Sequence, residues 1–333
     1  MIIAELLLML LVILVAAEVF TNALEHLGEK LKISEGVTGS LFAAVGTALP
    51  ETLVPLLAIF AGTANSQVNE EIGVGAILGA PLMLSTLSIF LMALAVLKKR
   101  GLHGHLTPEH GGLTRDLNFF ILAFSFSALA LWVPHQQATL RVLLAIGMVL
   151  IYFIYILLTL RASSKLVAEG HATEAGDKMF LARLGLPQNM AVILMQLLLA
   201  LGLLVGGAKG FIYGVEQASE LLHISPLLLS LMIIPIATEL PEKVNSILWI
   251  RKHKDTLAFG NITGAMVFQG TLLPAIGITL TPWAPSKPVL MGIVLTLVAA
   301  LWLRIMVGRG QLRVWMLGVN GSLYFLYLFI VLY

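Results

Sequence analysis

The chain contains no cysteine and few charges: of its 333 residues, 11% are charged and 59% are hydrophobic. Without cysteine, disulfide bonds and thiolate metal sites are excluded. A soluble domain carries about 25% charged residues, so this composition excludes an ordinary soluble protein. The net charge of +2 gives no reason to expect nucleic-acid binding. A mean hydropathy of +0.96 instead indicates a polytopic protein of the lipid bilayer.

Long hydrophobic runs fill most of the sequence. A helix needs roughly 20 apolar residues to cross the hydrocarbon core of a membrane. We therefore predict an all-α polytopic membrane protein, with ten spans at about 2–22, 38–62, 72–97, 117–133, 138–160, 189–208, 225–250, 258–281, 288–307 and 313–332. The first run contains Glu5 and Glu18 and has no basic segment before it, which favours a retained helix over a cleaved signal peptide.

Basic residues are concentrated in alternate loops. The loops after the first, third, fifth, seventh and ninth predicted spans, counted with the span ends beside them, each contain two or more lysines and arginines. The loops and span ends on the other side contain only Arg141, Lys209 and Lys287. The positive-inside rule assigns the basic side to the cytoplasm. We therefore expect a multi-pass protein of the plasma (inner) membrane, with both termini outside the cytoplasm.

The longest polar interruption separates five predicted spans from the other five. We predict a first repeat over residues 1–160, a cytoplasmic linker over 161–188 and a second repeat over 189–333. Because each half has an odd number of spans, the second half enters the membrane from the opposite side. The sequence thus predicts two inverted five-helix repeats, a plan that many secondary transporters share.

The two halves correspond at a constant offset of 191 positions. Leu-Pro-Glu occurs at 49–51 and again at 240–242, and at the same offset Phe20 corresponds to Phe211. The correspondence extends across polar and charged positions as well as apolar ones. It therefore indicates an internal repeat rather than the general similarity of apolar helices.

Each Leu-Pro-Glu places a carboxylate in a run that is apolar enough to cross a bilayer. An ionisable group at that depth is costly and by default marks an ion or substrate pathway. The proline before each glutamate has no N–H, so a carbonyl one turn earlier loses its helical donor. Thr47 and Thr238 add hydroxyls one turn before Glu51 and Glu242. These are the oxygen ligands that calcium takes. The alternative is that each proline only kinks its helix and each glutamate pairs with another helix.

These segments resemble the calcium/cation antiporter superfamily, the sodium/calcium exchangers and their relatives. Repeats of that family carry Gly-Thr-Ser-Leu-Pro-Glu, followed by a helix with Gly-Asn-x-x-Gly-Ser-Asn. This chain has Gly-Thr-Ala-Leu-Pro-Glu at 46–51 and Ala-Thr-Glu-Leu-Pro-Glu at 237–242. The helices that follow carry Gly-Ala-Ile-Leu-Gly-Ala at 75–80 and Gly-Asn-Ile-Thr-Gly-Ala at 260–265. The resemblance covers nearly the whole chain.

The resemblance implies an antiporter, not an enzyme, that exchanges calcium or a related divalent cation against sodium or protons and needs no cofactor. It also implies ligands in both halves. These are Glu51 and Glu242 for the divalent cation, Thr47 and Thr238 for that cation or for sodium, and the backbone carbonyls of Ala44 and Pro235 for sodium.

The departures from the family pattern concern the counter-ion. Several family serines are replaced, and Glu239 adds a carboxylate one turn from Glu242. A buried carboxyl group close to another carboxylate takes up a proton more readily, so Glu239 is a candidate proton carrier. Its alternative role is an ion pair with Lys243, four residues later. Asn261 and Gln269 share one face of the eighth predicted span and are candidate cation ligands or interhelical hydrogen-bond partners.

Two further features complete the sequence-based expectations. Asp255 opens the eighth predicted span, and we interpret it as a helix N-cap. The expected partners are inorganic cations and the lipid bilayer, and the sequence sets no oligomeric state. A cation channel and a proton-coupled transporter of another divalent metal are the alternative functions.

Overall fold

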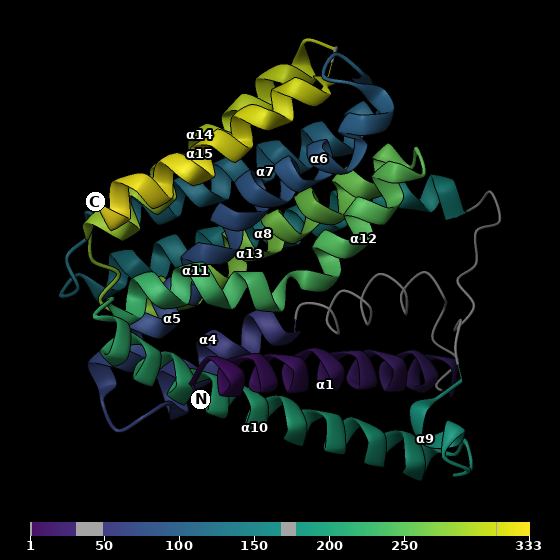
Figure 1. The fold of residues 1–333 in the computed structure, drawn as a ribbon, viewed down its shortest axis with the longest axis vertical. Coiled ribbons are helices and arrows are strands. Elements are labelled where there is room, and N and C mark those ends of the chain that lie inside the picture. Colours follow the sequence, from purple (N-terminus) through teal and green to yellow (C-terminus); the bar gives the residue numbers. More distant parts are fainter. Residues whose placement is uncertain (1, 31–48, 168–177, 311) are drawn as a thin grey trace. The chain divides into compact units, whose positions relative to one another are not determined.

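Residues 2–30, 49–167, 178–310 and 312–333 are described by a computed structural model of the protein. Nearly all of these residues are helical, which confirms the prediction of an all-α polytopic membrane protein (Figure 1). Within these ranges, 8 helical stretches are long and apolar enough to cross a membrane. The shorter apolar helices Pro50–Ala61 and Pro226–Ile236 lie within the second and seventh predicted spans. The count of ten spans stays a prediction.

The chain divides into two compact units. Unit 1 consists of residues 1–69 with 158–224, and unit 2 of residues 70–157 with 225–333. Each unit therefore combines segments from both halves of the sequence. The repeats and the linker stay a prediction from the sequence, whereas the compact units follow which helices pack together.

Unit 1 is built around two long helices that correspond in the sequence repeat. Its complete helices are α1 (Ile2–Lys30), α4 (Leu49–Ala61), α9 (Phe180–Arg183) and α10 (Met190–Leu222). It also holds the start of α5 (Ser66–Met83) and the end of α8 (Ala138–Val167). Helices α1 and α10 pack side by side, as Figure 1 shows in purple and teal.

Glycines on α10 explain how closely α1 approaches it. A Cβ atom added to Gly207, Gly210 or Gly214 would lie 2.5 to 3.1 Å from side chains of α1. The spacing of three and four residues puts these glycines on one face of the helix. Because lipid tails are as apolar as leucine, membrane helices associate through close packing of small residues like these.

Unit 2 contains the remaining helices. They are the rest of α5 and α8, the π-helix η2 (Leu84–Ser88), α6 (Ile89–Arg100), α7 (His110–Ala130), α11 (Pro226–Thr238), α12 (Leu240–Arg251), α13 (Asp255–Leu280), α14 (Lys287–Gly308) and α15 (Val314–Leu332). Two short strands, β1 (His105–Leu106) and β2 (Leu312–Arg313), pair antiparallel. This pairing ties the loop after α6 to the start of α15.

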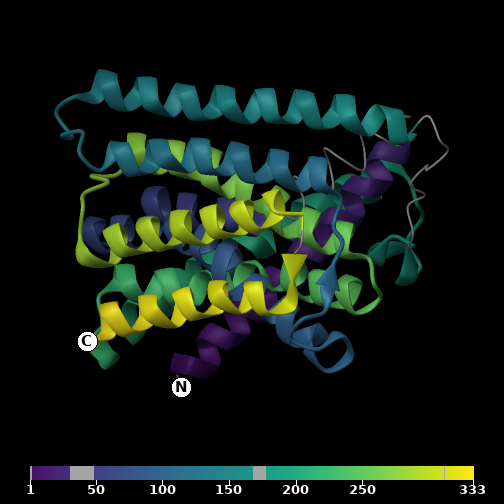
Figure 2. The ribbon, with the colours of Figure 1, turned by 90° about the horizontal axis from the view of Figure 1, so that it is seen from above.

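Burial separates the central helices of unit 2 from those at its periphery. The apolar windows of α13 and of the α5–α6 stretch are 67% buried, whereas that of α8 is 17% buried. Figure 2 shows α8 running along the outside. Exposed leucines such as Leu143, Leu150 and Leu157 line α8. A helix this apolar and this exposed requires lipid as its surroundings.

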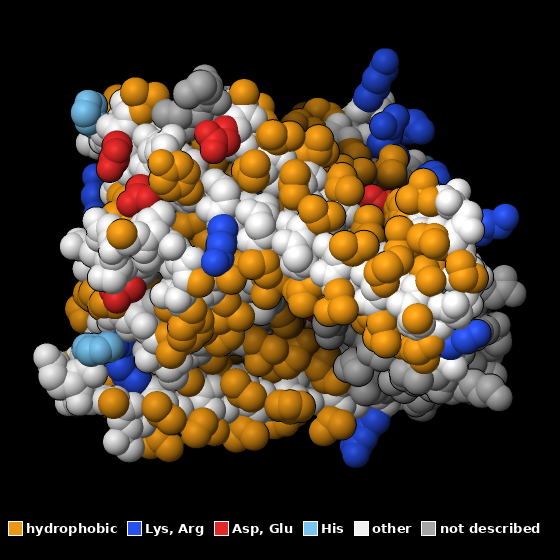
Figure 3. All heavy atoms as spheres, turned by 90° about the horizontal axis from the view of Figure 1, so that it is seen from below, with side chains coloured by type: hydrophobic (Ala, Val, Ile, Leu, Met, Phe, Trp, Pro, Cys, Tyr) orange, Lys and Arg blue, Asp and Glu red, His pale blue; other side chains and the backbone are white. Residues whose placement is uncertain are grey.

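The surface of unit 1 has the same character. Leu198, Leu199 and Leu203 of α10 are exposed. In the face drawn in Figure 3, hydrophobic side chains form a wide band, and most of the charged side chains in view lie toward its edges. This distribution matches an integral membrane protein, whose charged residues gather where the surface meets water.

Candidate cation-binding site

The second Leu-Pro-Glu lies at an interruption between two helices. Helix α11 ends at Thr238, α12 begins at Leu240, and Glu239 between them has φ −92° and ψ 11°. Pro241 has no N–H, so it cannot donate the helical hydrogen bond to the carbonyl four positions earlier. The seventh predicted span is therefore two shorter helices. Irregular backbone of this kind is tolerated at membrane depth only inside the protein or along a cavity.

Glycines of α5 allow α11 to pack closely against it. Within unit 2, a Cβ atom on Gly75 would overlap the hydroxyl of Ser230, and one on Gly79 would overlap the carbonyl of Leu231. The same Cβ on Gly79 would lie 2.7 Å from Cγ of Pro235. The predicted repeat motif at 75–80 thus supplies the surface on which the first part of the broken helix packs.

Lys243 lies on the first turn of α12, and its side chain reaches back to the interruption. Its ammonium nitrogen Nζ is 2.7 Å from the backbone oxygen of Pro235 and 3.4 Å from Oε2 of Glu239. It is also 2.9 Å from the sulfur of Met83 on α5. Glu239 is fully buried and Lys243 is 7% exposed. The sequence offers two roles for Glu239, a proton carrier or an ion-pair partner of Lys243. The structure contains the ion pair.

Glu242 is buried on the first turn of α12, with 8% of its surface exposed. Within the described part of the chain, its Oε2 has no hydrogen-bond partner. Its backbone oxygen accepts a hydrogen bond of 3.0 Å from Nδ2 of Asn261, which also donates to the hydroxyl of Ser246 at 2.9 Å. Asn261 therefore ties α13 to α12 and holds the backbone at Glu242 in place.

Two other predicted ligands are also buried in unit 2. The hydroxyl of Thr238 donates to the carbonyl of Ile234 at 3.2 Å, one turn back along α11. Gln269 is 2% exposed, and its Oε1 has no hydrogen-bond partner among the described residues. Buried polar atoms in native proteins nearly always have partners, so the unpartnered oxygens of Gln269 and Glu242 are suited to meet an ion.

The first-half ligands are described only in part. Glu51 lies on α4 in unit 1 and is 4% exposed, which is the burial that the repeat predicts for it. Thr47 and Ala44 lie outside the described residues. No cluster of three or more histidine, aspartate or glutamate side chains occurs in the part of the chain that the structure describes. The joining of Glu51 and Glu242 in one site stays a prediction.

Buried polar groups also occur at positions that were not singled out from the sequence. Asp116 accepts hydrogen bonds from Thr263 at 2.7 Å and from Tyr155 at 3.2 Å. It lies within α7, which begins at His110, so the fourth span was predicted to begin too late. Asn320 donates to the carbonyls of Ser85 at 2.8 Å and Ala299 at 3.2 Å. An amide in the middle of an apolar span was the signal that could have singled it out.

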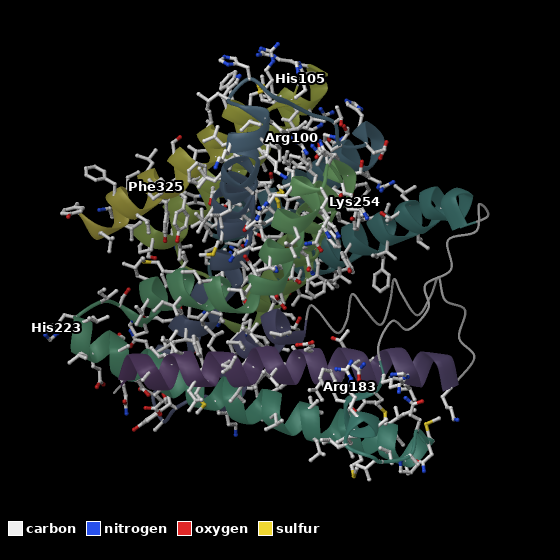
Figure 4. All side chains as sticks on the ribbon, turned by 45° about the vertical axis from the view of Figure 1, so that its right-hand side comes forward. Arg100, His105, Arg183, His223, Lys254 and Phe325 are labelled. Atoms are coloured by element: carbon white, nitrogen blue, oxygen red, sulfur yellow. The ribbon has the colours of Figure 1, made fainter. Side chains whose placement is uncertain are left out.

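Asp255 is the residue whose predicted role is wrong. The N-cap of α13 is Lys254, and Asp255 is the first residue of the helix itself. Its carboxylate instead makes a two-point ion pair with Arg100 of α6, at 2.7 and 2.8 Å. Figure 4 labels Arg100 and Lys254 near each other, at the end of unit 2 that also carries His105. A tertiary partner from a distant helix has replaced the local capping role.

The sequence profile of the sodium/calcium exchanger protein family matches residues 1–161 and 192–333. The chain belongs to this family. The match leaves out most of the predicted linker at 161–188. It assigns this exchanger-family protein to membrane transport of cations.

Known proteins similar to this exchanger-family chain are named as antiporters or exchangers. CaxA of Alkalimonas amylolytica is 24% identical over 281 residues, which cover 82% of this chain and 79% of that protein. The H⁺/Ca²⁺ exchanger CAX has a TM-score of 0.70 at 18% identity and is matched over 100% of this chain and 82% of its own. The sodium-calcium exchanger NCX_Mj has a TM-score of 0.54 at 18% identity, over 98% of this chain and 99% of its own. At these identities the two structures show a shared fold.

Proposed function

We propose that this protein is a secondary antiporter that exchanges calcium, or a related divalent cation, against sodium or protons by alternating access. The observation that carries the proposal is the buried Glu242 at the interruption between α11 and α12, with Oε2 unpartnered among the described residues. Membership in the sodium/calcium exchanger family supports it. Transporters use broken helices of this kind to offer backbone oxygens and buried carboxylates to an ion.

Charge balance supplies the proposed mechanism. Glu51 and Glu242 together carry two negative charges, which a divalent cation offsets. Moving these carboxylates through the conformational cycle without a cation would be costly, because charge in a low-dielectric medium is poorly solvated. Sodium ions or protons must therefore occupy them on the return step. That requirement couples the two fluxes.

The test is calcium uptake into proteoliposomes by variants that remove one carboxylate charge at a time. We expect Glu51→Gln and Glu242→Gln to reduce uptake to the level of protein-free vesicles while the purified proteins stay folded. Glu220→Gln is the matched control, because Glu220 is exposed on α10. Normal uptake by both site variants would refute the proposal.

The same vesicles distinguish the counter-ions and the alternatives. Uptake is driven by a sodium gradient alone and then by a pH gradient alone, and the gradient that drives it identifies the counter-ion. Calcium flux that needs no opposing cation would indicate a channel instead. Uptake of manganese but not of calcium would indicate a transporter of another divalent metal.

We also propose that both termini lie outside the cytoplasm. The chain has no cysteine, so a single introduced cysteine reports its own side of the membrane. His103 and Gln136 are exposed and lie in loops on opposite predicted sides. An impermeant thiol reagent added to intact cells should label Gln136→Cys and leave His103→Cys unlabelled. The reverse pattern would invert the topology.

A further inference from the structure

The positively charged ammonium of Lys243 lies beside the interruption between α11 and α12. We propose that the ammonium of Lys243 is a tethered cation, which occupies a monovalent cation site formed by the carbonyl of Pro235 and the carboxylate of Glu239. A variant that lacks this ammonium should bind a free monovalent ion in its place. The proposal deepens the proposed exchange function and rests on it for its consequence in transport.

The contacts of Lys243 carry the argument. Its Nζ is 2.7 Å from the backbone oxygen of Pro235 and 3.4 Å from Oε2 of Glu239. A carbonyl oxygen and a carboxylate are hard oxygen ligands of the kind that alkali and alkaline-earth cations take in proteins. The ammonium is a compact point charge on a flexible stem, so it suits a site of this kind better than a planar guanidinium would.

The position of the ammonium depends on the broken helix. Lys243 is two turns along the chain from Pro235, and its side chain reaches back across the interruption to the carbonyl of that residue. The same carbonyl accepts a weaker bond of 3.3 Å from the backbone N–H of Glu239. The Lys243 ammonium therefore holds the end of α11 and the start of α12 together.

The charge of Lys243 matters because the carboxylates beside it are buried. Glu239 is 0% exposed, and the nearby Glu242 is 8% exposed. A buried carboxylate without a counter-charge is strongly unfavourable. With Lys243 offsetting Glu239, Glu242 is the carboxylate of this pair that remains available to a transported ion. In transport, the tethered cation then reduces by one the monovalent ions that this half can carry per cycle.

The test measures cation binding through the melting temperature of the purified, detergent-solubilised full chain. Sodium, lithium or potassium chloride replaces choline chloride at constant ionic strength. We expect Lys243→Met to gain stability with one of these cations, by about 5 °C more than the wild type when the cation is saturating. Lys243→Arg retains a charge, and Lys287→Met removes one elsewhere, so both should follow the wild-type curve.

A second variant shows whether the new cation dependence comes from Glu239. In Glu239→Gln/Lys243→Met the carboxylate is gone, so the gain with monovalent cations should disappear. A folded Lys243→Met protein whose stability is the same in choline and in every alkali cation would overturn the proposal.

Folding failures are also informative. If Lys243→Met fails to fold in every one of these salts while the double variant folds in all of them, the uncompensated charge of Glu239 causes the failure, which supports the proposal. If neither variant folds, the side chain is needed for packing and the proposal is wrong. None of these readouts requires calcium exchange. A wild-type protein without exchange activity would therefore refute the proposed function and leave the test of Lys243 intact.

Discussion

The ion pair between Arg100 and Asp255 should make the stability of unit 2 highly sensitive to the loss of either partner. Both side chains are nearly buried, at 8% and 3% exposure, and the two contacts measure 2.7 and 2.8 Å. Arg100 also donates to the carbonyl of Ile250 at 2.7 Å, and Asp255 accepts from the backbone N–H of Thr107 at 2.9 Å. The pair therefore joins α6, α12, α13 and the loop after α6.

Removing one partner leaves the other charge buried and uncompensated. We expect Asp255→Asn and Arg100→Met each to lower the free energy of unfolding by about 3–5 kcal/mol. At roughly 2 °C per kcal/mol for a chain of this size, the melting temperature should fall by about 6–10 °C. The double variant has no unpaired charge. Its loss should be smaller than the sum of the two single losses by at least about 1 kcal/mol.

The assay is thermal unfolding of the purified protein in detergent at one fixed scan rate, since large proteins often unfold irreversibly. Arg251→Met is the matched control for Arg100→Met. Arg251 is exposed at the end of α12, so its loss should change stability by less than about 0.5 kcal/mol. If the single variants of Arg100 and Asp255 have the same melting temperature as this control, the reasoning is refuted. Strictly additive losses in the double variant would refute the coupling.

Two further predictions concern helix packing. Gly79→Ala should lower stability by about 1–3 kcal/mol because its Cβ would overlap the carbonyl of Leu231, whereas Gly260→Ala, with open space around it, should raise stability by up to about 1 kcal/mol. Melting temperatures that move in the same direction would contradict this. Asn320→Leu should cost about 1–3 kcal/mol because the carbonyl of Ser85 loses its buried donor, and an unchanged melting temperature would show that this bond is dispensable.

The sequence predicted the helices well where hydrophobic length was the deciding signal. The starts of α8, α10, α14 and α15 lie within two residues of the predicted spans. It was less accurate where polar residues enter a helix. Helix α7 begins at His110 rather than at 117, with Glu109 as its N-cap. Asp116 inside the helix accepts hydrogen bonds from Thr263 and Tyr155 of other helices. Partners of this kind do not appear in a hydropathy pattern.

The sequence by itself determined that this is a membrane protein of the exchanger family, because apolar run length and two motifs in register are properties of the chain alone. It also placed Glu51 and Glu242 at buried positions. Only the tertiary structure decided which partners the other buried polar groups have. Lys243 bonds to Pro235 and Glu239, and Asn261 holds the backbone of Glu242. The reason is physical: a side chain's charge is written in the sequence, but its neighbours depend on how the helices pack.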